Sequence, residues 1–231
     1  MDLANLPPPR VVIVDGIVAA TTLALAADMR RESLVVEVAT ADLLRAPPGA
    51  SVYVFRFDAA TGLALAADIV AWATGAKPPP GLLGVIDGGE QADREELLAA
   101  GFDDGIAGPP SARELAARVR AVHRRVHGRS RESSPRLRFG VVTIDTAGHA
   151  LWVDGQVVPL TAIELAVARA LVSAHGRAMS RAELIDAAWG DDELEIGERA
   201  VDNVVLRLRR KLPRPDVVET VRGVGFRIAR S

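Results

Sequence analysis

The sequence predicts two α/β-type domains of different construction: residues 1–126 and residues 137–231, joined by a linker at 127–136. In the first half, short apolar runs alternate with helical patterns, which indicates a doubly wound parallel sheet covered by helices on both faces. The second half begins with alternating strands bounded by turns and continues with three helices and a closing hairpin, an α+β arrangement. The segment between them is polar, contains Gly, Ser and Pro, and lacks apolar periodicity, as in a flexible linker.

Composition narrows the class of protein. Of the 231 residues 49% are apolar and none is cysteine, so the chain has ample core material and neither disulfides nor thiolate metal sites. The four histidines are scattered without metal-ligand spacing, and no apolar run approaches the roughly 20 residues of a membrane span. The Pro-rich N-terminus does not resemble a signal peptide. We expect a cytoplasmic protein with no cofactor, no metal and no membrane partner.

In the first domain, short apolar runs predict the strands and amphipathic patterns predict the helices. The expected strands are 11–14, 35–38, 52–55, 82–86 and, more weakly, 105–107. The expected helices are 19–31, 62–74, 93–100 and 112–127.

In the second domain, the expected first strands are 137–139, 141–144, 150–153 and 157–158, with a hairpin signal at Asp154-Gly155. Capping boxes starting at Thr161 and Ser180 predict the beginnings of two helices. A third helix is expected from about Glu198 to Leu212, since Pro213 cannot continue it. Two short strands, 217–221 and 226–228, then close the chain around the turn 222–225. Three helices followed by a hairpin make a winged helix.

The third helix has one apolar face. That face consists of Val201, Val205, Leu208 and Leu212, which recur at steps of 4, 3 and 4. The residues expected to point away from it are Arg199, Asn203, Leu206, Arg207 and Arg210. In a DNA major groove, arginines can bind phosphates or guanine, Asn203 can pair with adenine, and Leu206 can touch a thymine methyl. The helix by itself is equally compatible with a solvated surface helix.

The hairpin after this helix favours the DNA-binding interpretation. Arg222 lies between Thr220 and Gly223 on a tight turn that can enter the minor groove. The stretch 199–227 also carries 8 basic and 3 acidic residues, as a phosphate-contacting surface requires. Double-stranded DNA is therefore the expected partner.

Four segments resemble the effector domain of OmpR/PhoB-type response regulators, and the resemblance extends over about residues 137–230. They are 159–164 (PLTAIE), 180–189 (SRAELIDAAW), 199–212 (RAVDNVVLRLRRKL) and 219–227 (ETVRGVGFR). The resemblance implies sequence-specific DNA binding and transcriptional regulation. The positions at which it implies DNA contacts are Arg199, Arg207, Arg209, Thr220 and Arg222.

Two features of this half depart from the family or leave alternatives open. Val204 and Leu206 occupy positions where the family often has a His and a polar or basic residue, so the preferred base sequence is expected to differ. The loop from Gly190 to Gly197 corresponds to a segment that the family offers to RNA polymerase, and it is strongly acidic here. A solvated loop is the alternative interpretation.

Residues 10–125 resemble the receiver domain of the same family, a flavodoxin-like or CheY-like (βα)5 fold. An active receiver holds Mg²⁺ with an acidic pair, accepts a phosphoryl group on Asp, and neutralises its charge with Lys. A hydroxyl after the fourth strand senses the phosphorylated aspartate. The residues found at these positions are Asp15 and Gly16 for the acidic pair, Arg56 for the acceptor, Asp87 for the hydroxyl and Gly108 for the lysine.

This replacement pattern predicts a degenerate receiver that cannot be phosphorylated. Arg56 is a cation, so it cannot accept a phosphoryl group and should repel Mg²⁺. We expect it to pair with Asp15 inside the old pocket. Asp58, two residues further on, is the alternative acceptor.

A dimerisation surface is the other feature that the resemblance implies. Its expected residues are Arg94, Asp103, Asp104, Glu114, Arg118 and Arg125. The expected pairs between chains are Arg94 with Glu114, Asp104 with Arg118 and Asp103 with Arg125. The alternative is local: Ser111 caps its helix at Glu114, which pairs with Arg118 in the same helix, and such surface pairs are individually weak.

The sequence thus predicts a homodimeric, phosphorylation-independent transcription regulator. The alternative is a sensor whose receiver binds a small molecule or partner protein, with the segment 77–80 (KPPP) and the vacated pocket as its only indications. An enzyme is disfavoured, because the glycines in 84–89 (GVIDGG) match neither a P-loop nor a dinucleotide fingerprint.

Overall fold

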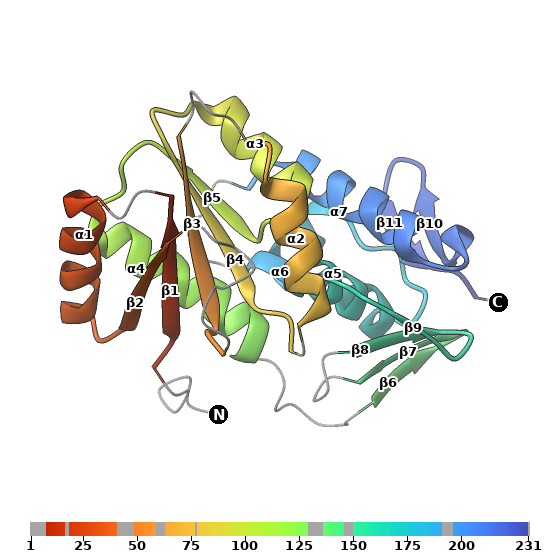
Figure 1. Cartoon of the computed structure of the whole chain (residues 1–231). Coiled ribbons are helices and arrows are strands. Elements are labelled where there is room, and N and C mark those ends of the chain that lie inside the picture. The colour runs from red at the N-terminus through yellow and green to blue at the C-terminus, as the bar shows by residue number, and fades with distance from the viewer. Residues whose placement is uncertain are drawn as a thin grey trace. The chain divides into compact units, whose positions relative to one another are not determined.

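The structure is a computed structural model that describes residues 8–16, 19–40, 49–58, 63–76, 78–128, 136–145, 150–190 and 196–230. The chain divides into two units: Met1–Ala73 with Pro80–Gly128, and Thr74–Pro79 with Arg129–Ser231. Figure 1 colours the described residues up to 128 from red to green and those from 136 onward from green to blue.

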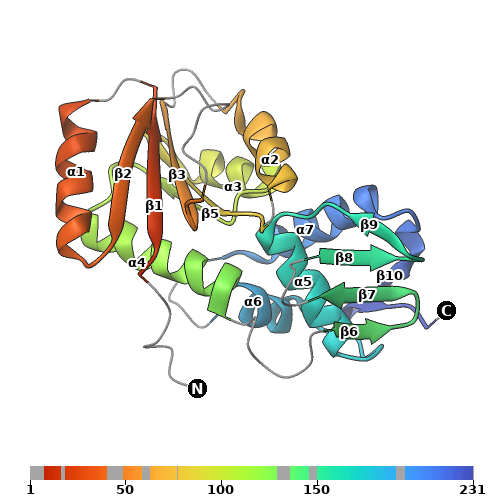
Figure 2. The ribbon, with the colours of Figure 1, turned by 60° about the horizontal axis from the view of Figure 1, so that its bottom comes forward.

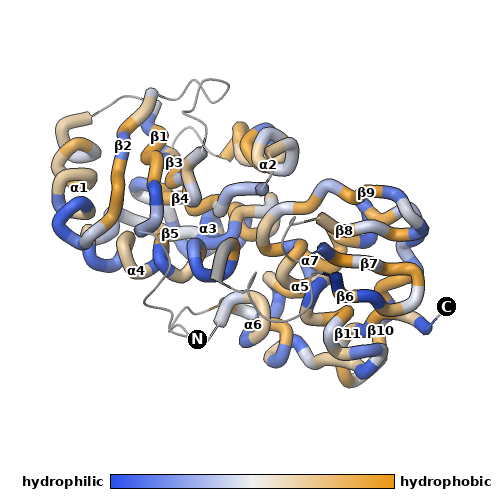
Figure 3. Tube along the Cα trace, turned by 90° about the horizontal axis from the view of Figure 1, so that it is seen from below, coloured by the Kyte–Doolittle hydropathy of each residue, from blue (hydrophilic) through white to orange (hydrophobic). Residues whose placement is uncertain are grey.

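The first unit is built on a five-stranded parallel sheet with the strand order β2-β1-β3-β4-β5. The strands are β1 (Arg10–Asp15), β2 (Val35–Thr40), β3 (Val52–Asp58), β4 (Gly81–Asp87) and β5 (Asp104–Ala107). The run Val11–Val14 is at most 2% exposed, as expected for a central strand buried on both faces. The strands accordingly trace mostly hydrophobic stretches in Figure 3. The predicted receiver-like α/β fold is therefore confirmed.

In the part of the chain that the structure describes, four helices cover this sheet. They are α1 (Ala20–Arg31), α2 (Ala66–Gly75), α3 (Gln91–Ala100) and α4 (Ala112–His123), the last continued by a π-helical turn at Arg124–Gly128. Helices α1 and α4 lie on one face, and α2 and α3 lie on the other (Figure 2). On the α2–α3 face, Tyr53 and Trp72 pack edge to face, with their ring centroids 4.9 Å apart. Phe55 and Phe102 pack in the same way, with their ring centroids 6.0 Å apart.

Two details of the first unit bear on function. Strand β3 is longer than predicted and continues through Arg56 to Asp58, so Arg56 has a defined direction from the sheet. Gly84 lies inside β4, where an added Cβ would approach a Leu97 methyl to 2.4 Å. This glycine therefore allows close packing of α3 on the sheet and does not form a nucleotide-binding loop.

The second unit begins with a four-stranded antiparallel sheet of order β6-β7-β8-β9. Its strands are β6 (Arg136–Phe139), β7 (Val142–Asp145), β8 (Ala150–Val153) and β9 (Gln156–Val158). The turn between β8 and β9 has positive φ at Asp154 and Gly155, 50° and 79°, as predicted for an Asp-Gly hairpin.

Three helices and a hairpin complete the winged helix. They are α5 (Ala162–Ser173), α6 (Arg181–Trp189), α7 (Glu198–Lys211), a 3-10 turn (Pro215–Val217), β10 (Val218–Val221) and β11 (Gly225–Ile228). Both predicted capping boxes are present, at Thr161 with Glu164 and at Ser180 with Glu183. Within the ranges described above, no helix combines the length and the apolar character that crossing a bilayer requires.

Candidate DNA-binding surface and altered receiver pocket

Helix α7 presents one continuous outward stripe, which we call the reading stripe. Its members are Arg199, Asn203, Leu206 and Arg210, spaced 4, 3 and 4 residues apart and therefore on one face of the helix. Arg199, Leu206 and Arg210 are exposed and Asn203 is half-buried, with Leu206 at 46% exposure.

The opposite face of α7 anchors the helix in the domain core. Val201, Val204, Val205 and Leu208 are each at most 1% exposed, and Leu212, just beyond the helix, is 7% exposed. Val204 therefore belongs to the core, although the family resemblance placed it at a position often held by His. Anchoring along this whole face holds the reading stripe outward.

Arg207 does not point outward. Its Nε donates to Oε1 of Glu164 over 3.1 Å, and its side chain is only 12% exposed. Glu164 is fully buried, and its Oε2 also accepts from Lys211 Nζ at 2.7 Å and from the backbone N–H of Thr161 at 2.9 Å. A buried carboxylate requires such partners. Arg207, which was expected to point away from the domain, is therefore engaged with a buried charge, and its contact with DNA stays a prediction.

Arg209 joins α7 to the hairpin. Its Nε and Nη2 donate to the carbonyl oxygen of Val218 at 2.9 and 2.7 Å, and Nη2 also donates to Thr220 Oγ1 at 2.8 Å. Its guanidinium lies 5.8 Å from the ring centroid of Phe226. Arg209 and Thr220, both expected to contact DNA, therefore contact each other. Their contact sets the position of the β10–β11 hairpin, the wing, relative to α7.

The wing is a tight hairpin whose turn carries Arg222 and Val224, both exposed. Gly223 at the turn has φ of 73°, which favours glycine. A Cβ on Gly225 would lie 2.0 Å from the carbonyl oxygen of Met179, whose backbone pairs with Phe226. Among the residues that the structure describes, no carboxylate pairs with Arg210 or Arg222. A hollow of about 740 Å³ beside the wing is lined in part by Arg209, Thr220, Arg222 and Arg227.

Helix α6 supports the first turns of α7. Arg181 of α6 pairs with Asp202 of α7 at 2.8 Å, and this hydrogen-bonded partner raises the pKa of Arg181. The Arg181 guanidinium also lies 5.1 Å from the Phe226 ring centroid.

In the first unit, Arg56 fills the pocket at the carboxyl ends of β1, β3 and β4. Its Nη1 lies 3.7 Å from Asp15 Oδ2, and its Nη2 donates to Asp87 Oδ2. The hydroxyl of Thr22 accepts from Arg56 Nη1 and donates to Asp15 Oδ2. The expected contact between Arg56 and Asp15 is therefore present, and the Arg56 side chain occupies the pocket.

The sequence interpretation missed two members of this cluster as partners of Arg56. Asp87 could have been found from its place at the end of β4, the strand that pairs with β3. Arg56 lies in register with Val85, two residues before Asp87. No signal in the sequence indicated Thr22, which comes from α1.

Of the remaining receiver positions, Gly108 has a backbone conformation that favours glycine. Gly108 follows β5 with φ of 91°, and its N–H donates to the carbonyl oxygen of Ile86 at 2.8 Å, so a lysine there would be strained. Gly16 directly follows Asp15 at the end of β1. Asp58 is the exposed last residue of β3. In the described parts of the chain, no group of three or more His, Asp or Glu residues is placed to hold a metal ion.

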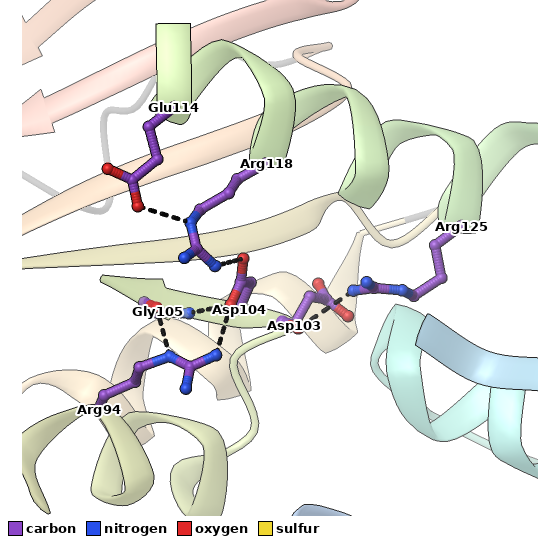
Figure 4. Close-up of polar contacts among 7 residues, drawn as sticks. All are labelled: Arg94, Asp103, Asp104, Gly105, Glu114, Arg118 and Arg125. Carbon is purple, nitrogen blue, oxygen red and sulfur yellow. Dashed lines mark hydrogen bonds and ion pairs between the residues drawn. The ribbon is translucent and has the colours of Figure 1, made fainter. Parts of the chain in front are cut away.

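The six residues expected in a dimer interface gather on α3, at β5 and the residue before it, and along α4 and the π-helical turn that continues it (Figure 4). The fully buried Asp104 binds Arg118 Nη1 at 3.0 Å and Arg94 Nη2 at 3.5 Å. Arg118 Nε also pairs with Glu114 at 3.2 Å, Arg94 Nε donates to Gly105 O at 2.7 Å, and Arg125 donates to Asp103 O at 3.1 Å. All these contacts form within one chain.

The local alternative for Glu114 is thus present in the structure: its N–H donates to Ser111 Oγ at 3.1 Å, and its carboxylate pairs with Arg118. Two other features singled out in the sequence, acidic residues 191–195 and Lys77, lie outside the described residues.

The fold and these two sites define a receiver-like unit followed by a winged helix, and comparison with known proteins agrees. A family model described as "Transcriptional regulatory protein, C terminal" matches residues 155–228. The phosphate regulon transcriptional regulatory protein PhoB of Rhizobium meliloti is 39% identical over 141 residues, 60% of this chain and 61% of PhoB. The transcriptional regulatory protein CutR of Streptomyces coelicolor is 35% identical over 150 residues, 65% of this chain and 67% of CutR.

The solved structure of a RitR mutant has the same fold, with a TM-score of 0.76 at 17% identity over 96% of this chain and all of that one. The chain belongs to the family of OmpR/PhoB-type response regulators. The PhoB alignment spans about three fifths of that relative's length.

Proposed function

We propose that this chain is a sequence-specific DNA-binding transcription regulator that acts as a homodimer and without aspartate phosphorylation. The observation that carries the DNA-binding part is the reading stripe. It faces outward because the opposite face of α7 is buried and because Asp202, Arg207 and Lys211 bind neighbouring elements of the domain. The relatives named above are transcriptional regulatory proteins, which agrees with this proposal.

In the proposed complex, α7 lies in the major groove and the wing reaches the adjacent minor groove. The reading stripe contacts base edges and phosphates, and Arg222 contacts the minor groove. Arg209 holds the wing at its distance from α7, while Arg207 keeps the core beneath the helix intact. Several other arginines of this unit are already paired with carboxylates or carbonyls: Arg177, Arg181, Arg209, Arg214 and Arg227. Two half-sites bound by a dimer therefore add affinity that one unit alone does not supply.

Phosphorylation independence rests on Arg56. A guanidinium has no nucleophilic oxygen to accept a phosphoryl group, and its positive charge occupies the space between Asp15 and Asp87 where a cation would otherwise be attracted. The cluster carries its own counter-charge at all times. The receiver therefore has one arrangement of this pocket and no chemical switch at it.

The proposed dimer uses the α3–β5–α4 surface. Glu114 is 44% exposed and Arg118 is 20% exposed, so their pair can open toward a second copy at small cost. Asp104 keeps its contact with Arg94 if Arg118 exchanges partners. The buried charge is therefore never left without a cation during dimer formation.

Two measurements test the proposal. Selection from a random duplex pool should yield a common sequence that the full chain retards in a gel, and a failure to enrich any sequence would contradict DNA recognition. Incubation with acetyl phosphate and Mg²⁺ should leave the intact mass unchanged and the DNA affinity unaltered. A phosphate adduct, at Asp58 or elsewhere, would contradict phosphorylation independence.

A further inference from the structure

Leu206 is an exposed leucine at the centre of the reading stripe. It is 46% exposed, with Asn203 three residues before it and Arg210 four residues after it on the same face. The core of the domain does not use this side chain, because the buried face of α7 lies opposite. The three other members of the stripe are polar or charged.

The chemistry of the major groove restricts what a leucine can contact there. Among the four bases, only thymine presents a methyl group in that groove, on C5. Any other base edge would lose water to the leucine without gaining a hydrogen bond, which is unfavourable. Leu206 therefore favours thymine in two ways. It contacts the thymine methyl group, and it disfavours base edges whose polar groups it would remove from water.

Asn203 extends the selection to a second base pair. A carboxamide is suited to adenine, since it can accept from N6 and donate to N7. Three residues along a helix advance by about 4.5 Å and one base pair by about 3.4 Å, so side chains spaced like Asn203 and Leu206 can reach neighbouring pairs. The two side chains together fit an A·T pair beside a pair with thymine in reach of Leu206.

We propose that Leu206 is a specificity-determining residue that selects one thymine through its methyl group, next to an adenine read by Asn203. This inference rests on the proposed function, since it assigns the base preference of the same surface.

The test removes only the methyl group. In the duplex selected by the wild-type chain, each thymine is replaced in turn by deoxyuridine, which keeps the base pair and its hydrogen bonds. One replacement should weaken binding of the wild-type chain by about fourfold, the effect of losing one buried methyl group. Leu206→Ala should bind the thymine and deoxyuridine duplexes with equal affinity, and Asn203→Ala should lose preference at the neighbouring pair.

Val157→Ala is the matched control, because Val157 is a similarly exposed apolar residue (57%) on β9. It should keep the wild-type ratio between thymine and deoxyuridine duplexes. If no replacement affects the wild-type chain, or if Leu206→Ala keeps the wild-type ratio, the assignment of Leu206 is overturned while DNA binding stands. If the wild-type chain selects no duplex, the proposed function itself fails. Thermal unfolding of each variant shows that the fold is retained.

Discussion

Arg207 Nε lies 3.1 Å from Oε1 of Glu164, joining the reading helix to the start of α5 through a fully buried carboxylate. Lys211 occupies the other carboxylate oxygen at 2.7 Å. One acidic residue therefore fixes two cations on the inner flank of α7. We therefore expect that the exposed arginines of α7 can be substituted without disturbing the fold, whereas Arg207 cannot.

Replacing Arg207 by Ala should destabilise the second unit by about 2 kcal/mol, somewhat less than the loss of a whole buried pair because Lys211 remains. Urea unfolding followed by circular dichroism measures the change. Arg210→Ala, on the exposed face of the same helix, is the control and should stay within about 0.5 kcal/mol of wild type. Equal stability of the two variants would show that the Glu164 contact contributes nothing.

Arg210→Ala and Arg222→Ala should weaken DNA binding without affecting stability. If each side chain neutralises one phosphate, the slope of log K against log salt falls in magnitude by about 0.9 per variant. Affinities measured over a range of salt concentrations give this slope. Arg177→Ala, which removes a cation paired with Glu183 outside the reading stripe, should leave the slope unchanged. An unchanged slope in both stripe and wing variants would remove these two residues from the interface.

Arg56→Ala should convert the receiver pocket into a site that responds to divalent cations. Without the guanidinium, Asp15 and Asp87 lose the cation that both of them contact, so the variant should be less stable at neutral pH and should recover stability on addition of Mg²⁺ or Mn²⁺. Thermal unfolding with and without the cation measures the recovery. The wild-type chain and the double variant Arg56→Ala/Asp87→Asn serve as controls and should not respond. A variant that is as stable as wild type and indifferent to cations would contradict the role given to Arg56.

Reversing the charge at Glu114 should shift the proposed dimer toward monomer. Glu114→Arg adds a third cation beside Arg94 and Arg118 in the dimer, and like charges repel. Sedimentation velocity at micromolar concentration reports the state. Arg31→Glu, an exposed reversal on α1, should leave the dimer intact. A wild-type chain that sediments as a monomer under these conditions would rule out the dimer itself.

Glu183 should make the second unit more stable at neutral than at acidic pH. The backbone N–H of Ser180, followed by Arg177, lowers the pKa of Glu183 in the folded chain. A lowered folded-state pKa means that this contribution is fully present above the ordinary glutamate pKa of about 4.3 and disappears as the pH falls through the lower folded-state value. The stability difference between wild type and Glu183→Gln should follow that course in urea unfolding. A difference that is independent of pH would indicate a role other than charge.

Local patterns predicted the elements well. Strands β1, β2 and β4, both capping boxes, the Asp-Gly turn and the buried stripe of α7 all depend on residues close in sequence, which is why they could be predicted. The start of α2 at Ala66 and the extension of β3 to Asp58 were missed, because packing and strand pairing decide where an element ends. The presence of a cation at position 56 was evident from the sequence, but its second acidic partner, 31 residues away, was not.

By itself, the sequence determined that α7 has an inner and an outer face, that a wing follows it, and that the receiver has an arginine in place of a phosphate acceptor. Only the tertiary structure decided which arginines remain available. Arg207 and Arg210 are three residues apart and chemically identical, yet one lies against a carboxylate 43 residues away and the other faces solvent. Periodicity assigns a residue to a face, whereas its charge partner is set by the packing of distant elements, and the cost of leaving a buried carboxylate without a cation fixes that choice.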